Sequence, residues 1–159
     1  MRTLAIAVIC LLAAPPAFAG DLIAGTNRYE TDMRSWPTGL HAGYYMYDSQ
    51  GEIEIHSGPI PGGPVECHGA GFWTEKEIDG NGICIFGAAP DRWTVAFEME
   101  KGNAFDKQIK NTYRRRGAWK VVEGTGKYWG MTGEGTFVTG PVVGGKKTTE
   151  WEGEVEIPK

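Results

Sequence analysis

Residues 121–137 read VVEGTGKYWGMTGEGTF, and this stretch decides the fold predicted for the chain. Apolar residues lead into it. Aromatic residues Tyr128 and Trp129 interrupt a series of glycines at positions 124, 126, 130, 133 and 135. Glycine allows tight bends and close approach of neighbouring chains in a curved sheet. We therefore expect a strand, a glycine-rich connection with a short aromatic insert, and a second strand.

The same glycines invite comparison with a phosphate-binding loop. A Walker loop needs a glycine five residues before the Gly-Lys pair and a helix after it, and neither accompanies Gly126-Lys127. A dinucleotide fingerprint needs a surrounding βαβ unit, and no helical run lies nearby. The tight-bend interpretation is therefore preferred.

The segments around this stretch also favour strands. In residues 148–157 four glutamates, at positions 150, 152, 154 and 156, alternate with three apolar residues and one glycine. In residues 92–100, alternation places Trp93, Val95, Phe97 and Met99 on one face. Such period-two patterns predict an all-β chain, and a polar outer face with an apolar inner face is typical of the wall of an antiparallel barrel. Pairing of the last strand with an early one would remove the sheet edges.

The middle of the chain adds two predicted strand pairs. Residues 43–57 are expected to form a hairpin that turns at residues 48–51. Residues 65–73 form the next expected strand, and residues 83–86 return after Asp-Gly and Asn-Gly turn signals. Cys67 and Cys84 then lie on adjoining strands. A disulfide between them is expected in an exported chain, where it would stabilise the fold by about 3 kcal/mol. A redox or metal pair would need the closer C-x-x-C spacing.

The N-terminus predicts the destination of the protein. Residues 1–19 resemble a secretory signal peptide, with an apolar core and cleavage after Ala19, so a periplasmic or secreted location is expected. Residues 20–40 are expected to form a partly ordered arm, and residues 41–159 the barrel domain. Without Arg2, fifteen basic residues remain against 20 acidic ones, a formal charge of −5. That charge disfavours nucleic acid as a partner, and no remaining segment is long and apolar enough to span a membrane.

The glycine-rich stretch resembles a signature of bacterial proteins related to allene oxide cyclase and dirigent proteins. Residues 67–73, 82–87 and 91–93 are similar to the same proteins, and the resemblance covers roughly residues 43–138. It implies a calycin-type eight-stranded barrel. It also implies either cyclisation of a fatty-acid epoxide or guided coupling of phenoxy radicals. No catalytic residue of either family can be matched to a position here.

Six tryptophans suggest either a core filled by its own side chains or a lined pocket, and the sequence leaves both open. For the pocket, Trp73, Trp93, Phe97 and Trp119 are the expected lining, and a small hydrophobic or aromatic molecule is the expected ligand. Glu98 becomes a candidate acid or base only if Trp93 and Phe97 face outward. The alternatives are a cyclase-like isomerase, which is less favoured, and a structural or envelope-interaction protein, for which a homo-oligomer is one form considered.

The sequence gives little support for a metal site or for a site that binds polyanions. Histidines at positions 41, 56 and 68 lack metal-ligand spacing, so neither a metal nor a cofactor is expected. Between residues 107 and 120 the basic residues are Lys107, Lys110, Arg114, Arg115, Arg116 and Lys120, with Arg92 expected nearby. They favour solvated, edge-protecting strand residues over a patch that binds polyanions.

Overall fold

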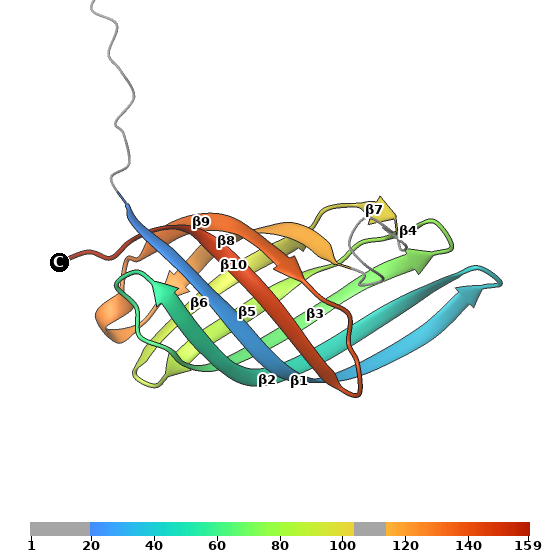
Figure 1. Cartoon of the computed structure of the whole chain (residues 1–159), viewed down its shortest axis with the longest axis horizontal. Coiled ribbons are helices and arrows are strands. Elements are labelled where there is room, and N and C mark those ends of the chain that lie inside the picture. Colours follow the sequence, from blue (N-terminus) through green and yellow to red (C-terminus); the bar gives the residue numbers. More distant parts are fainter. Residues whose placement is uncertain (1–19, 104–113) are drawn as a thin grey trace, which may run out of the picture.

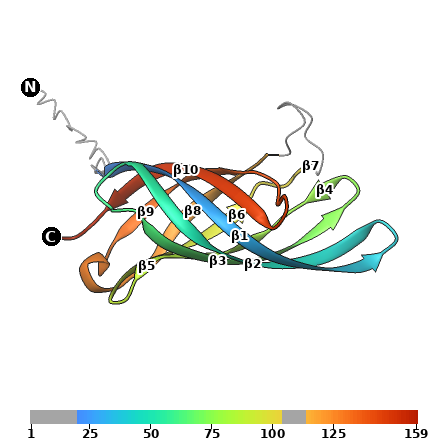
Figure 2. The same ribbon diagram turned by 60° about the horizontal axis from the view of Figure 1, so that its bottom comes forward.

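The barrel wall consists of eight antiparallel strands, seen in a computed structural model that describes residues 20–103 and 114–159 (Figures 1 and 2). The wall strands are β1 (Asp21–Gly39), β2 (Ala42–Ser57), β3 (Gly63–Thr74), β5 (Asn81–Ala88), β6 (Asp91–Met99), β8 (Arg115–Gly124), β9 (Thr132–Thr139) and β10 (Lys146–Glu156). Two short strands, β4 (Glu77–Ile78) and β7 (Gly102–Asn103), extend one end, and a 3-10 turn, η1 (Gly126–Tyr128), lies between β8 and β9. The predicted all-β, eight-stranded antiparallel barrel is confirmed.

Closure follows the predicted pairing of the last strand with an early one. Strand β10 pairs with β1 from Asp21 opposite Val155 to Glu30 opposite Lys146. On its other side β1 pairs with β2. Strand β2 in turn pairs with β3, which completes the ring. Glutamates on β10 face outward while Trp151 and Val155 face inward, as the alternation predicted.

The predicted N-terminal arm is wrong. Residues 21–39 form β1, a long strand within the wall between β2 and β10, so the barrel begins about twenty residues earlier than expected. The inward face of β1 is difficult to recognise from the sequence, because the polar residues Asn27 and Thr31 are buried on it beside Ile23 and Tyr29. Cross-strand partners satisfy these polar groups, which a propensity argument does not reveal.

The predicted turn at residues 48–51 is also wrong, because β2 runs unbroken through it. Ser49 is only 1% exposed, and its hydroxyl lies 2.9 Å from the hydroxyl of Thr31 on β1. At Gly51 an added Cβ would lie 1.8 Å from the carbonyl oxygen of Arg28, so the neighbouring strand approaches too closely for any side chain. These turn-forming residues mark close approach in a continuous strand.

The glycine-rich stretch forms the predicted strand, connection and strand: β8, η1 and β9. Gly135 on β9 and Gly153 on β10 stand opposite each other. A Cβ added at either position would lie within 2.6 Å of a ring carbon of Trp119. The two glycines therefore make room for an indole ring lying across the inner face of the wall.

The two cysteines are brought together as predicted. Cys67 on β3 and Cys84 on β5 are directly paired, and their sulfur atoms lie at disulfide distance inside the barrel. The predicted signal peptide lies outside the described residues. Among the residues described, no helix has the length and apolar character needed to cross a membrane.

Candidate functional site

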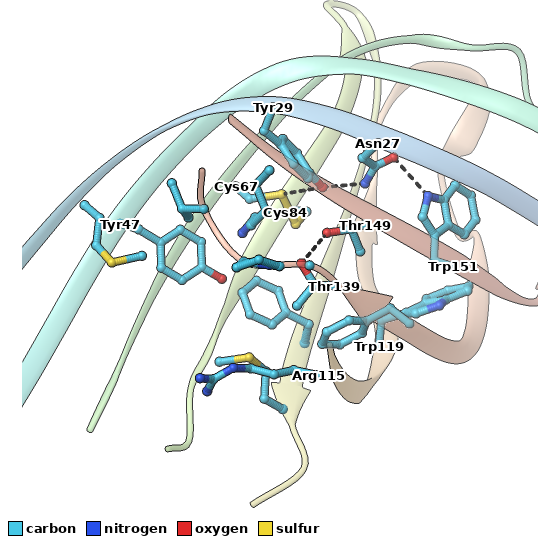
Figure 3. A pocket seen from close by; sticks show the side chains of 18 of the residues that line it. Asn27, Tyr29, Tyr47, Cys67, Cys84, Arg115, Trp119, Thr139, Thr149 and Trp151 are labelled. Atoms are coloured by element: carbon cyan, nitrogen blue, oxygen red, sulfur yellow. Dashed lines mark hydrogen bonds between the residues drawn. A yellow bond between two sulfur atoms is a disulfide. The ribbon is translucent and has the colours of Figure 1, made fainter. Parts of the chain in front are cut away.

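A cavity of about 490 Å³ occupies part of the barrel interior (Figure 3). All four residues predicted as lining, Trp73, Trp93, Phe97 and Trp119, border it. Its other aromatic and apolar lining side chains are Tyr29, Met33, Tyr45, Tyr47, Ile78, Phe86, Val95, Met99, Phe137, Pro141, Val142 and Trp151. The barrel is therefore partly hollow. Of the two interiors that the sequence left open, a filled core occupies one end and a lined pocket the other.

The closed end is the end that carries the β2–β3 loop, the β5–β6 turn and η1. Trp93, 2% exposed, stacks on Phe86 with ring centroids 4.2 Å apart. Trp151 meets Trp93 and Trp119 edge to face, at 6.1 and 5.9 Å between centroids. Further apolar side chains are buried at this end without lining the cavity: Ile23, Ile53, Ile60, Val65 and Val155. This end is a packed core and forms the floor of the cavity.

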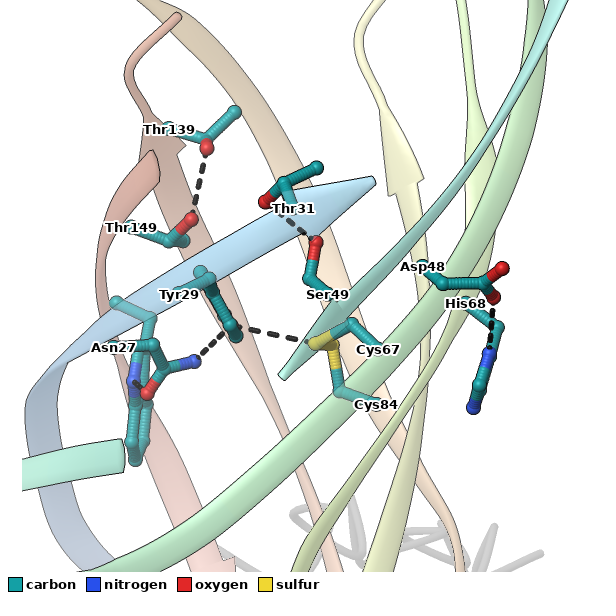
Figure 4. Close-up of a disulfide and its surroundings, with 11 residues drawn as sticks. Asn27, Tyr29, Thr31, Asp48, Ser49, Cys67, His68, Cys84, Thr139 and Thr149 are labelled. Atoms are coloured by element: carbon teal, nitrogen blue, oxygen red, sulfur yellow. Dashed lines mark hydrogen bonds and ion pairs between the residues drawn. A yellow bond between two sulfur atoms is a disulfide. The ribbon is translucent and has the colours of Figure 1, made fainter. Parts of the chain in front are cut away.

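A polar cluster lies at the middle of the cavity wall (Figure 4). The Asn27 side chain accepts a 2.9 Å hydrogen bond from Trp151 Nε1 and donates one to the Tyr29 hydroxyl. That hydroxyl also lies 3.3 Å from Cys67 Sγ. Burial raises the pKa of Tyr29 far above its usual value, so the phenol stays neutral. The cluster satisfies buried polar groups and holds the indole and phenol rings in place.

The open end carries the β1–β2 turn and the β9–β10 connection. Here two cationic side chains, Arg115 from β8 and Lys147 from β10, line the cavity. The ammonium of Lys147 lies 4.2 Å from the ring centroid of Tyr47 and 5.3 Å from that of Tyr29. Burial lowers the pKa of Lys147 to about 8. The Tyr47 ring extends from β2 toward the middle of the cavity (Figure 3).

Arg115 is partly buried beside Tyr45. Burial lowers its pKa from the usual value, and the nearby Tyr45 phenol opposes that effect. Within the described part of the chain, its Nη1 atom is buried without a hydrogen-bond partner. Tyr45 itself donates a 2.5 Å hydrogen bond to the carbonyl of Asp79, and burial raises its pKa to about 12.

The charge of the cavity is opposite to that of the chain. The chain has a formal charge of −4, yet no aspartate or glutamate is among the described residues that line the cavity. Along β10 the glutamates stand on the outer face, in water. Two positive charges therefore lie in an apolar, aromatic space without an acidic neighbour in its described wall.

Sequence reasoning found the aromatic lining and missed the cations and Tyr47. A signal was present, because inward positions recur with a period of two. Counting back by twos from Trp151 on β10 reaches Lys147, and counting back from Trp119 on β8 reaches Arg115. A lysine or arginine at an inward position of a barrel strand is the pattern that could have identified them.

Other predicted chemistry falls outside the cavity. Glu98 is exposed while Trp93 and Phe97 are buried, so the conditional acid or base hypothesis for Glu98 is wrong. In the glycine-rich loop, the Asp91 carboxylate accepts a 3.0 Å hydrogen bond from the Lys127 backbone N–H. The backbone N–H of Lys127, which a phosphate in this loop would use as a donor, is therefore already bonded to a carboxylate.

The histidines also lie outside the cavity, and so do the described residues of the basic stretch other than Arg115. His68 pairs with Asp48 at 2.7 Å on the outer face (Figure 4), and the residues described contain no metal-binding cluster. Arg114 and Arg116 flank Arg115 and are exposed, with Arg114 3.5 Å from Glu150. The remaining exposed cations of this basic set are Arg92 and Lys120, while Lys107 and Lys110 lie outside the described residues.

Comparisons with known proteins add no assignment. No protein-family model matches the sequence, and no curated protein is similar to it. The barrel is consistent with a calycin-like fold, and the narrower likeness to allene oxide cyclase and dirigent proteins rests on the sequence motifs alone.

Proposed function

We propose that this protein binds a small hydrophobic or aromatic molecule inside the barrel. The observation that carries the proposal is the cavity of about 490 Å³ lined mainly by aromatic and apolar side chains. Small-molecule sites are typically concave, apolar and about 300–1,000 Å³ in volume. A barrel of eight strands is just wide enough to be filled by its own side chains or to hold one small ligand.

The position of the cavity supports ligand entry. Its lining includes exposed residues at the open end, among them Met33, Ser35 and Pro141. Trp73 stands at the same end, where its Nε1 donates a 3.1 Å hydrogen bond to Ser35 Oγ. A ligand entering there would meet the aromatic cluster of Trp93, Trp119 and Trp151 as the floor.

The test is a fluorescence titration of the mature protein with neutral aromatic and aliphatic probes, together with native mass spectrometry for co-purified small molecules. Binding should perturb tryptophan emission, because three indoles border the cavity floor. Val95→Phe fills cavity space and should weaken binding, whereas Val122→Phe, on the exposed face of β8, should not. Equal binding by both variants, or no binding by the native protein, would contradict the proposal.

A cyclase-like isomerase is the alternative that the motif resemblance supports. The observation in its favour is a set of proton-carrying groups at an apolar site: the neutral phenols of Tyr29 and Tyr47 and the lysine with its lowered pKa. Incubation with a fatty-acid epoxide and chiral analysis of the products tests this alternative. Product composition equal to that of the uncatalysed reaction would exclude it.

A structural or envelope-interaction role is favoured by a different surface. Outside the barrel, Tyr44 lies between Trp36 and Phe72, with ring centroids 6.2 and 5.1 Å away. Trp36 and Phe72 are exposed, and such patches commonly mark interaction sites. Sedimentation of the native protein and of Trp36→Ser tests self-association, and identical monomeric behaviour would remove this support.

We also propose that the protein is exported, with a periplasmic or secreted location. The Cys67–Cys84 pair at disulfide distance is compatible with an oxidising compartment. The intact mass of the protein recovered from cells should equal that of a chain beginning at Gly20. A mass that includes residues 1–19 would contradict the proposal.

A further inference from the structure

We propose that the ligand carries a carboxylate, bound at the open end of the barrel by Lys147, with Arg115 and the Tyr47 hydroxyl beside it. This inference rests on the proposed binding function and specifies the chemical class of the ligand. It starts from the charge of the wall, which presents two cations and no acid among its described lining residues.

The cationic groups are linked through a row of phenol rings. Tyr45 and Tyr47 stack with centroids 6.2 Å apart, Lys147 lies over Tyr47, and Arg115 lines the same cavity as Tyr45. The row spans β2, β8 and β10 and therefore faces the cavity from three strands. An anionic group entering at this end would meet both cations and at least one phenol.

The free-energy cost of burying the Lys147 ammonium favours an anion beside it. A charge removed from water is unfavourable unless it is paired and hydrogen-bonded. The ring faces of Tyr47 and Tyr29 attract the Lys147 ammonium, but such contacts supply only part of the lost hydration. The described hydrogen bonds and ion pairs include no acceptor for Lys147 Nζ. A carboxylate would supply the missing acceptor through a charge-assisted hydrogen bond.

The remainder of the cavity sets the orientation of such a ligand. Away from the cations, the wall passes through Phe97 and Phe137 to the cluster of Trp93, Trp119 and Trp151. Charged groups at one end and aromatic rings at the other match an amphipathic molecule. Its apolar body would lie on the aromatic floor, and its carboxylate would point toward the open end.

The experiment compares matched pairs of probes: laurate with lauryl alcohol, and naphthoate with methyl naphthoate. Near neutral pH, each carboxylate should bind roughly tenfold more tightly than its neutral partner, because a hydrogen bond to a charged group contributes about that much. Lys147→Met should remove most of the preference, and Lys147→Arg should keep most of it. Lys146→Met, the matched control on the exposed face of the same strand, should leave the preference unchanged.

A pH series on the native protein gives a readout that needs no variant to fold. The preference for laurate should fall as pH rises through about 8, because Lys147 loses its proton there. Among the described residues, the other titratable groups facing Lys147 are the phenols of Tyr29 and Tyr47, whose raised pKa values keep them neutral, and Arg115 keeps its charge. The affinity for lauryl alcohol should stay constant across the series.

The outcomes separate this inference from the function on which it rests. Equal affinity for laurate and lauryl alcohol in the native protein would overturn the carboxylate assignment while cavity binding stands. A preference that is undiminished in Lys147→Met, or that does not change with pH, would also overturn it. Binding of none of the four probes would remove the proposed function itself.

Discussion

The two ends of the barrel use their inward-facing positions in opposite ways. At the closed end, Trp93 and Phe86 stack next to buried aliphatic side chains and form part of the cavity floor. At the open end, Tyr47, Arg115 and Lys147 border a cavity. Packed apolar groups stabilise the folded state, whereas partly buried charges without an acidic neighbour oppose it. The difference indicates that stability is concentrated at the closed end, and the open end is where we propose that a ligand is recognised.

The largest expected effect comes from breaking the closed end. Trp93→Ala should lower the free energy of unfolding by about 3–5 kcal/mol, because it removes a fully buried indole and leaves a cavity among Phe86, Trp119 and Trp151. Urea unfolding followed by circular dichroism measures the loss. Phe72→Ala, at a side chain 56% exposed, is the control and should change stability far less. Equal losses would mean that the closed end is not the main source of stability.

The disulfide should rank second, between the two ends. Replacing both cysteines (C67A/C84A) should lower the free energy of unfolding by about 3 kcal/mol, because the unfolded chain gains conformational freedom when the cross-link is removed. Unfolding of the native protein with and without reductant gives the same comparison. The double variant should be insensitive to reductant. A native protein that is equally insensitive would show that the cysteines are not cross-linked in solution.

A smaller effect, of opposite sign, is expected at the open end. Lys147→Met should raise the free energy of unfolding of the empty protein by about 1–2 kcal/mol at neutral pH, because the partly buried ammonium no longer loses hydration on folding. Chemical unfolding of the two proteins under identical conditions measures the gain. A loss of stability would contradict the assignment of the open end to recognition.

The pH dependence of that gain follows from the lowered pKa. Lys147 titrates at about 8 in the folded state and at 10.5 when unperturbed. Between these values the unfolded chain holds a proton that the folded protein has released, so native stability rises with pH across this window. Below about 8 the penalty is fully present. The advantage of Lys147→Met should therefore shrink as pH rises from 8 to 10.5, and a constant advantage would contradict this explanation.

The smallest expected effect lies on the outer wall, away from both ends. Glu54 accepts a 2.5 Å hydrogen bond from Arg28, which lowers the pKa of the carboxyl group. Both side chains are largely in water, where such pairs contribute little to stability. Glu54→Gln should leave the urea midpoint and probe binding unchanged within error. A clear shift in either would show that the outer face takes part in the difference between the ends.

The strands that could be predicted are those whose inner face is apolar along their whole length. In β6, the alternation of Trp93, Val95, Phe97 and Met99 identified both the strand and its buried face. Strand β1 was missed because Asn27 and Thr31 occupy inward positions, and β2 was wrongly divided because Ser49 and Gly51 resemble a turn. In each case a partner on another strand supplies the hydrogen bond or the space that makes the residue suitable.

Local patterns were therefore sufficient for the all-β class, the antiparallel barrel wall and the pairing of Cys67 with Cys84, and they pointed to four of the aromatic side chains that border the cavity. Period-two alternation and turn-forming residues involve only a few neighbouring positions, so they can be recognised from the sequence alone. Whether the interior is filled or hollow was decided only by closure of the barrel, because free volume depends on side chains from all eight strands. Arg115 and Lys147 border one cavity for the same reason, since their strands β8 and β10 lie on either side of β9 in the wall.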